Sequence, residues 1–312
     1  MVRILLGIFL TALLSPTVYG LDQTPIRIIT NNWTSQIVLS HITGDLLEKL
    51  GYRVEYVPSS VDAQWADMAH GINHLQMEIW EGTMAAKLGQ VSAAGRVVEL
   101  GEHSAHTRED WWYPAYVAKL CPGLPDWQAL KKCSAIFARS GSGKGVYIAG
   151  PWEKPDEARI RALGLNFIIH RVKDGDALWQ ELKAAAAHQD PIVLFNWSPN
   201  WVEAEYPGAF VEFPDYSEAC ESNPAWGINP QFAYDCGNPK GGWLKKAAWE
   251  KFPLIWPCAA NLVRNIQLDN TQISTLAALV DVNNLSYADA AQKWLNDNQS
   301  LWQSWLPASC KN

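Results

Sequence analysis

The feature of the sequence that most restricts its fold is the alternation of short apolar strands with amphipathic helices. In the first half, strands are predicted at Ile26–Thr30, 53–57 and Leu75–Trp80, with helices over 37–50 and 61–70 between them. The helical segments repeat their apolar residues every three or four positions, whereas the strands are short continuous apolar runs. This strand–helix–strand order favours a mostly parallel sheet with helices on both faces.

A second series of strands and helices follows Tyr116. Strands are predicted at 134–138, 166–172 and 192–196, and helices at 153–163 and 174–188. Residues 221–242 are rich in Pro, Gly and Asn and predict a long connection; the helices predicted after it cover 243–251, 254–267, 272–280, 287–296 and 301–305. We therefore expect two α/β lobes with a cleft between them, one formed by residues 21–116 and 235–312 and the other by residues 117–234.

The first twenty residues have the pattern of a secretory signal peptide. Arg3 precedes an apolar run at 4–14, and the small-residue site Val18-Tyr19-Gly20 predicts cleavage near Gly20. The run is short for a membrane span, so we expect an exported, periplasmic chain without stable membrane insertion.

Six cysteines are expected to form disulfides in such an oxidising compartment. Six cysteines allow fifteen pairings. We predict the sequential one because each pair closes a short or modest loop: Cys121–Cys133, Cys220–Cys236 and Cys258–Cys310. Metal ligation is the alternative, but the sequence has no CxxC or CxxH spacing, and no metal or cofactor is expected.

Enzyme signatures are weak in this sequence. The segment Ser140–Gly145 resembles a phosphate-binding loop, but it has Ala138 and Gly145 where that motif needs Gly and Ser or Thr, so we interpret it as a flexible loop. His103 and His106 lie in a polar stretch and are interpreted as surface residues. The net charge of −7 disfavours a nucleic-acid partner. No residue is predicted to be catalytic.

The seventeen tryptophans are the strongest functional signal. Most are predicted to pack in the core, among them Trp179, Trp249, Trp256, Trp294, Trp302 and Trp305. By contrast, four lie at strand ends or in the loops that follow, and these are Trp33, Trp80, Trp152 and Trp197. Ligands of open α/β sheets bind beyond the carboxyl ends of the strands, so we expect these four side chains to surround one ligand.

Several indole rings around one point are suited to a methylated onium cation. Such a cation donates no strong hydrogen bond, whereas each indole face attracts it by about 0.5–2 kcal/mol. Stacking on a sugar is the alternative. Sugar sites usually add several carboxylates, amides and arginines, which are sparse near the four tryptophans.

The chain also resembles the periplasmic substrate-binding proteins of ABC importers for glycine betaine, proline betaine and choline. The segments that carry the resemblance are Glu78–Trp80, Asn196–Trp201, Tyr234–Gly237 and Asp110–Val117. The resemblance extends over essentially the whole mature chain and implies a two-lobe, type II binding protein. It also implies that Trp80, Trp152 and Trp197 form an aromatic cage, with Trp33 as the additional tryptophan of the choline-type branch.

Both polar anchors of that family differ in this chain. Ser35 stands where choline-type members have Asp, and Glu81 begins the segment in which betaine-type members tend to have His. Glu81 would repel a betaine carboxylate but suit choline or a protonated N-oxide. If it faces solvent, backbone amides near Gly150 could hold a carboxylate instead. The predicted ligand-binding set therefore adds Ser35, Glu81, Tyr113 and Gly150 to the four tryptophans.

The sequence thus predicts a monomeric solute-binding protein that captures a small onium compound, such as glycine betaine, choline or trimethylamine N-oxide, and delivers it to an ABC permease. Two alternatives remain. One is a secreted enzyme acting on a choline ester or glycoside in the same cleft. The other is a ligand-sensing module for a membrane receptor.

Overall fold

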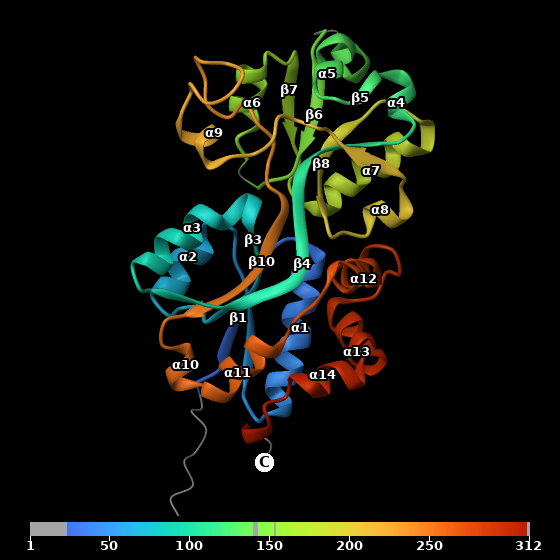
Figure 1. Ribbon diagram of the computed structural model, residues 1–312. Helices are drawn as coiled ribbons and strands as arrows, with labels where there is room; N and C mark the ends of the chain where they lie inside the picture. The colour runs from blue at the N-terminus through green and yellow to red at the C-terminus, as the bar shows by residue number, and fades with distance from the viewer. Residues whose placement is uncertain (1–23, 140–142, 153, 311–312) are drawn as a thin grey trace, which may run out of the picture.

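The computed structural model describes residues 24–139, 143–152 and 154–310. Figure 1 shows two lobes, one above the other, connected by the long strands β4 (Val97–Pro114) and β10 (Lys240–Trp249). We call the lobe that contains the first strand the first lobe and the other the second lobe. The predicted two-lobe α/β fold is confirmed. In the described residues, no helix is long and apolar enough to span a bilayer. The predicted signal peptide lies outside the described residues.

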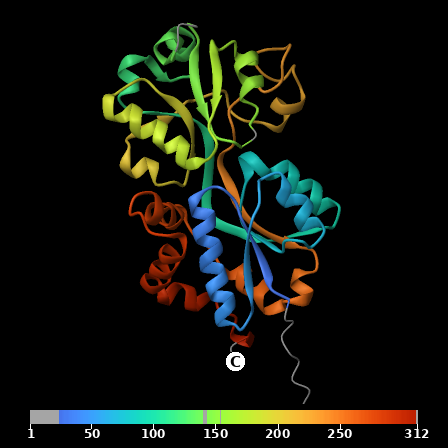
Figure 2. The same ribbon diagram turned by 180° about the vertical axis from the view of Figure 1, so that it is seen from behind.

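The first lobe combines the N-terminal strands and helices with the C-terminal helices. Its elements are β1 (Ile26–Thr30), α1 (Thr34–Lys49), β2 (Val54–Pro58), α2 (Ala63–Ala69), β3 (Leu75–Trp80), α3 (Glu81–Ala93), α10 (Phe252–Ile255), α11 (Pro257–Asn265), α12 (Asn270–Asp281), α13 (Tyr287–Asp297), α14 (Gln299–Trp305) and the 3₁₀ turn η2 (Ala308–Cys310). Seen from behind, in Figure 2, α1 lies beside α12 and α13, which it contacts.

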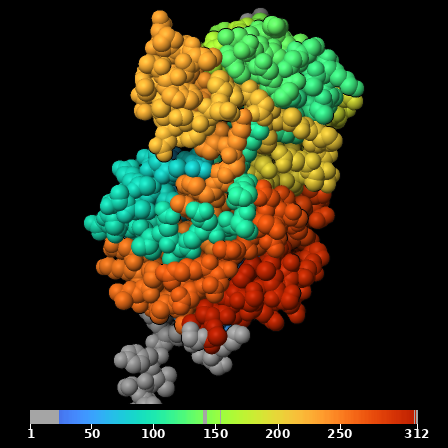
Figure 3. Space-filling model, viewed as in Figure 1, coloured from blue at the N-terminus to red at the C-terminus, as the bar shows by residue number. Residues whose placement is uncertain are grey.

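The second lobe is formed by the middle of the chain. Its elements are α4 (Val117–Leu120), β5 (Pro122–Pro125), α5 (Gln128–Cys133), the 3₁₀ turn η1 (Ser134–Phe137), β6 (Gly145–Ala149), α6 (Asp156–Leu163), β7 (Phe167–Arg171), α7 (Gly175–His188), β8 (Val193–Ser198), α8 (Val202–Glu205), β9 (Gly208–Phe210) and α9 (Glu218–Ser222). In Figure 3 the surface is indented at the left between the segment that carries α9 and the region of α2 and α3.

One hydrogen-bonded sheet passes through both lobes in the order β2-β1-β3-β10-β4-β8-β6-β7, with β9 pairing with β4. The strands on each side are parallel, as predicted, but β4 and β10 run antiparallel to their neighbours. Strand β4 changes partner at Arg108, which pairs with Lys240 of β10 and with Ser198 of β8. The predicted lobe boundaries, after residues 116 and 234, stay a prediction.

Two predicted elements are wrong. A strand was predicted at 134–138, but residues 134–137 form a 3₁₀ turn, and the strand of that region is β6. Residues 243–251 were expected to be helical, but most of them belong to β10. The run Lys245-Lys246-Ala247-Ala248 has good helix propensity, and its pairing with both β3 and β4 overrides that local preference.

Strand β4 was not predicted, and His103 shows why. This residue is buried within β4, so its interpretation as a surface residue is wrong. Its ring is hydrogen-bonded to Met77 O and Leu268 N, and burial lowers its pKa to about 3. Strand β4 contains many polar residues, so its sequence lacks the continuous apolar run by which the other strands were predicted. His106, by contrast, is exposed on the same strand.

The core contains most of the tryptophans, as predicted. Trp256, Trp294 and Trp305 are buried, whereas Trp249 and Trp302 are half-buried. Lys246 is buried as well; it donates hydrogen bonds to the carbonyl oxygens of Arg264 and Ile266 at the end of α11. A lysine in this position satisfies helix-end carbonyls that would otherwise lack partners.

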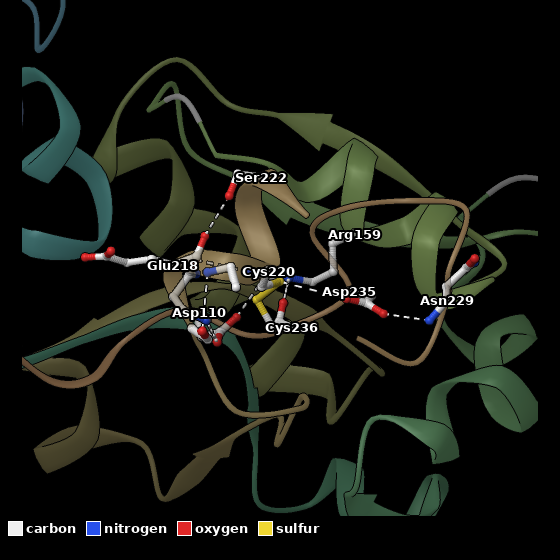
Figure 4. Close-up of a disulfide and its surroundings, with 11 residues drawn as sticks. Asp110, Arg159, Glu218, Cys220, Ser222, Asn229, Asp235 and Cys236 are labelled. Atoms are coloured by element: carbon white, nitrogen blue, oxygen red, sulfur yellow. Dashed lines mark hydrogen bonds and ion pairs between the residues drawn. A yellow bond between two sulfur atoms is a disulfide. The ribbon is translucent and has the colours of Figure 1, made fainter. Parts of the chain in front are cut away.

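The three predicted disulfides are confirmed: Cys121–Cys133, Cys220–Cys236 and Cys258–Cys310. Figure 4 shows the second of these with Arg159 of α6 beside it. The Arg159 guanidinium donates to the carbonyl oxygen of Cys236 over 2.8 Å and to Asp110 Oδ1 over 3.0 Å. Asp110 belongs to β4, so this disulfide is tied directly to the strand that connects the lobes.

The disulfides are expected to differ in their contribution to stability. Cys258–Cys310 closes a loop of sequence separation 52, and Cys121–Cys133 one of 12. Chain entropy then gives about 4 kcal/mol for the first and about 3 kcal/mol for the second. Replacing both cysteines of a pair by Ser, and measuring the free energy of unfolding in urea, should show the larger loss for the 258–310 pair. Equal losses, or the reverse order, would contradict this assignment.

Candidate functional site

A cavity between the lobes brings together the four tryptophans singled out in the sequence. Its empty volume is about 280 Å³, and its wall consists of Trp33, Trp80, Thr83, Met84, Glu109, Trp152, Phe195 and Trp197. Trp33 follows β1 and Trp80 ends β3, both in the first lobe, whereas Trp152 follows β6 and Trp197 lies in β8 of the second. Glu109 comes from β4. The cavity is therefore complete only when both lobes are present.

One buried carboxylate orients the two tryptophans of the first lobe. Glu78 Oε2 accepts hydrogen bonds from Trp33 Nε1 over 2.8 Å and from Trp80 Nε1 over 3.1 Å. The same oxygen accepts from Ser35 Oγ over 3.0 Å. Burial raises the pKa of Glu78 to about 7, against the three hydrogen bonds, which lower it. Because the polar edges of both rings are bound to one atom, their orientations are coupled.

Aromatic packing orients the tryptophans of the second lobe. The rings of Trp152 and Trp197 meet edge to face, with centroids 5.2 Å apart and an interplanar angle of 80°. Phe195 packs against Trp152 at 5.5 Å, and Trp179 packs against Trp197 from the other side at 5.0 Å. Such pairs are worth about 0.5–1.5 kcal/mol beyond their buried area. Trp179 is a core residue, as predicted, and it supports the cavity wall.

Two contacts join the lobes at the edge of this cavity. Trp152 Nε1 donates to Asn32 Oδ1 over 2.9 Å. Lys154, from the segment before α6, donates to the carbonyl oxygen of Gly82 over 3.1 Å. Both donors belong to the second lobe and both acceptors to the first, so the hydrogen bonds favour the arrangement in which both lobes form the cavity wall.

The polar part of the wall is centred on Glu109. Lys154 Nζ forms an ion pair with Glu109 Oε1 over 2.9 Å, with both side chains buried, and the Thr83 hydroxyl donates to the same oxygen. Among the described residues, Glu109 Oε2 has no hydrogen-bond partner although it is buried. The cavity thus combines aromatic faces with one carboxylate that a lysine compensates.

The other residues predicted to bind ligand lie outside the cavity wall. The Ser35 hydroxyl is bound to Glu78. Glu81 accepts a hydrogen bond from the backbone N–H of Trp243 over 3.1 Å, because at the start of α3 its side chain turns toward β10. Tyr113 is buried in β4, opposite Ala209 of β9. Gly150 lies beneath the Trp152 ring, where a Cβ atom would come within 2.2 Å of that ring.

Sequence reasoning missed the remaining wall residues, Thr83, Met84, Glu109 and Phe195. Glu109 directly precedes the Asp110–Val117 segment but was not predicted to bind ligand, because β4 was not recognised as a strand. Phe195 lies two positions before Trp197 on β8, on the same face of the sheet, so period-two alternation was the signal that could have found it. In the described residues, no cluster of three His, Cys, Asp or Glu side chains could hold a metal ion.

A second cavity borders the first and shares Trp33 and Trp197 with it. Its empty volume is about 630 Å³, and its other wall residues include Asp174, Asp176 and Tyr287. This larger space lies between the start of α7 and the first lobe. The two shared indole rings thus lie between an aromatic cavity and a more polar one.

The sequence of the chain matches a known protein family and a characterised relative. The model of the family described as the substrate binding domain of ABC-type glycine betaine transport systems (OpuAC) matches residues 24–297. The trimethylamine N-oxide-binding protein of Pelagibacter ubique (strain HTCC1062) is 38% identical over 293 residues, which cover 90% of each chain.

Solved structures share the fold at low sequence identity. A choline-binding protein of an ABC transporter, in complex with choline, has a TM-score of 0.72 at 17% identity, covering 90% of this chain and 91% of that one. A glycine betaine/L-proline-binding protein from Borrelia burgdorferi has a TM-score of 0.74 at 15% identity, covering 92% and 98%. Lactococcal OpuAC, in its closed form with glycine betaine, has a TM-score of 0.67 at 15% identity, covering 91% and 99%.

The packing of Trp152 on Gly150 can be tested by Gly150→Ala. The added Cβ atom would lie 2.2 Å from the indole, so the ring must move out of the wall. We expect a change in tryptophan fluorescence and a loss of about 1–3 kcal/mol in the free energy of unfolding. Gly89→Ala is the control, because Gly89 is exposed within α3 and its Cβ would meet no atom within 4 Å. Wild-type fluorescence and stability in Gly150→Ala would show that the ring is not held there.

Proposed function

The chain belongs to the family of substrate-binding domains of ABC-type glycine betaine transport systems, and on this basis we propose that it captures trimethylamine N-oxide in the tryptophan-lined cavity for delivery to an ABC permease. The observation that carries the proposal is the meeting of four indole rings from both lobes around one small space. Trp33, Trp80, Trp152 and Trp197 are the proposed cage. The protein is proposed to carry out no chemical step.

The cage is suited to a trimethylated nitrogen. The methyl groups around such a cation cannot donate strong hydrogen bonds, so attraction to the negative faces of aromatic rings is the main specific interaction available. Three or four desolvated faces at about 2 kcal/mol each would total about 6–8 kcal/mol, and 8 kcal/mol corresponds to a Kd of about 1 μM. Hydrogen bonds from Trp33 and Trp80 to Glu78 fix two of the rings beforehand, which reduces the cost of ordering them on binding.

The polar end of the cavity favours a ligand without its own carboxylate. Glu109 lines the wall, and a betaine carboxylate beside it would meet a like charge. The N-oxide oxygen is smaller and requires a donor, which the Thr83 hydroxyl can supply by turning from Glu109 toward the ligand. The similarity to a trimethylamine N-oxide-binding protein supports the same choice.

Choline is the second candidate because of one observation. Glu109 Oε2 is buried and lacks a partner in the described part of the chain, and the hydroxyl of choline could donate to it. Choline needs a longer space between the cage and the polar end than the N-oxide does. The ligand titrations below separate the two.

We further propose that the lobes close around the ligand by bending in β4 and β10. Strand β4 changes its partner at Arg108, next to Glu109, so a change in lobe angle would act directly on the wall of the site. The bonds of Trp152 to Asn32 and of Lys154 to Gly82 would form on closure. Export to the periplasm fits the three disulfides, and a monomer is the proposed form.

A panel of ligands tests the proposed function. Trimethylamine N-oxide, choline, glycine betaine, carnitine and proline would be added to the purified protein while thermal unfolding and tryptophan fluorescence are followed. We expect the N-oxide to give the largest rise in melting temperature, since a ligand that binds only the folded state stabilises it. Glucose and a neutral dipeptide serve as controls. A shift with these controls and none with any onium compound would overturn the proposal.

The role of individual cage residues can be tested by Trp80→Ala and Trp197→Ala. Each variant should weaken binding of trimethylamine N-oxide at least about tenfold, because it removes one aromatic face worth about 1.4 kcal/mol or more. Calorimetric titration gives the Kd directly. Trp302→Ala is the matched control, since Trp302 lies in α14, at the end of the first lobe away from the cavity (Figure 1). Unchanged affinity in Trp80→Ala and Trp197→Ala would show that these side chains do not bind the ligand and only pack in the core.

A further inference from the structure

We infer that Glu78 is a positioning residue and a buried counter-charge for the bound onium: as a carboxylate it fixes two cage rings and places a negative charge directly behind them. This inference rests on the proposed function, because it concerns how the same cavity holds its cation. Glu78 does not line the cavity, and so no direct contact with ligand is involved.

The geometry around Glu78 is unusual in that one oxygen atom serves three donors. Oε2 accepts from the indole N–H groups of Trp33 and Trp80 and from the Ser35 hydroxyl, at 2.8, 3.1 and 3.0 Å. Hydrogen bonds from N–H and O–H groups become stronger when the acceptor is ionised. Since the N–H group of each ring donates to the carboxylate, a negative charge on Glu78 lies at the edge of two rings of the cavity wall.

Glu78 has no cationic partner of its own among the described residues. On β10, Lys245 pairs with Glu99 and Glu102, and Lys246 is bound to carbonyl oxygens. On β4, His103 is bound to Met77 O.

The remaining charged groups near the cage are also engaged elsewhere. Across the cavity, Glu109 is paired with Lys154. Behind α1, Asp281 of α12 accepts a hydrogen bond from Thr34. The bound onium would therefore be the cation that compensates Glu78.

Burial without such a partner raises the pKa of Glu78. Its pKa is raised to about 7 chiefly by burial, so in the empty protein the carboxyl is largely protonated below neutral pH. Oε1 is buried and has no hydrogen-bond partner in the described residues, and it is the oxygen available to carry the proton.

Ligand binding and ionisation of Glu78 are then linked. A cation in the cage favours the carboxylate and lowers the pKa of Glu78 in the complex below its value in the empty protein. The complex consequently holds fewer protons than the free protein near neutrality, so onium affinity increases as pH rises through about 7. Asp281 has a pKa that burial raises to about 6, so any effect of its own titration would fall at lower pH.

The test measures the Kd of trimethylamine N-oxide between pH 6.5 and 8.5, a range in which this ligand keeps its zwitterionic form. The wild-type Kd should fall about threefold or more across the range, and calorimetry in two buffers of different ionisation enthalpy should detect proton release at pH 7. Asp281→Asn should retain both effects. A wild-type Kd independent of pH, without proton release, would overturn the inference even if the onium binds well.

Glu78→Gln separates charge from positioning. Gln can still accept the indole hydrogen bonds but carries no charge, so binding of the N-oxide at pH 8.5 should weaken about tenfold and lose its dependence on pH. Tert-butanol, the uncharged isostere of this ligand, should compete for the cavity equally well in Glu78→Gln and in the wild type. Ser35→Ala is the control variant, because it removes one hydrogen bond and leaves the charge.

The outcomes distinguish the two proposals. Equal losses for the N-oxide and tert-butanol in Glu78→Gln would mean that Glu78 only supports the rings, which contradicts the counter-charge. If Glu78→Gln does not fold, the pH dependence of the wild-type Kd and the proton release still test whether Glu78 acts as a counter-charge. Failure of the wild-type protein to bind any onium at any pH would instead refute the proposed function.

Discussion

The arrangement of the site depends on holding indole rings from separate segments with their faces toward one space. A flat, apolar ring is easily placed in a core, but presenting its face to a cavity requires that its edge be fixed. The first lobe does this with the Glu78 carboxylate, which binds the N–H groups of Trp33 and Trp80. The second lobe does it by edge-to-face packing of Trp152, Trp197 and Trp179. The strand order, the cleft and the cross-lobe hydrogen bonds all bring these two sets together.

Sequence reasoning located the four tryptophans of the cavity wall but not the groups that support them. A tryptophan at the end of an apolar strand is visible in the sequence, because parallel strands present their carboxyl ends to a ligand. Strand β4 was missed because it contains many polar residues and no continuous apolar run. Strand β10 was missed because its segment Lys245-Lys246-Ala247-Ala248 has helical propensity. Glu109 was missed for the same reason as β4. Glu78 was seen as part of a motif, whereas its role depends on Trp33, which is distant in sequence and adjacent only in the folded protein.

The charges around the cavity are arranged so that little net charge reaches its wall. Glu109 is compensated by Lys154, and Glu78 stands behind the rings rather than among them. A cavity of this kind attracts a cation mainly through aromatic faces. A trimethylated nitrogen has no N–H group, so it cannot form a hydrogen-bonded salt bridge with a carboxylate. The arrangement of the lobes that brings Lys154 to Glu109 also brings Trp152 to Asn32, so neutralisation of the wall and completion of the cavity occur together.

The most direct test of the proposed cage is a crystal structure of the protein with trimethylamine N-oxide. We expect the ligand nitrogen to lie within about 6 Å of the ring centroids of at least three of the tryptophans Trp33, Trp80, Trp152 and Trp197, with its oxygen toward the Thr83 hydroxyl. A ligand bound in the neighbouring cavity lined by Asp174 and Asp176, or a nitrogen remote from the indole faces, would contradict the cage.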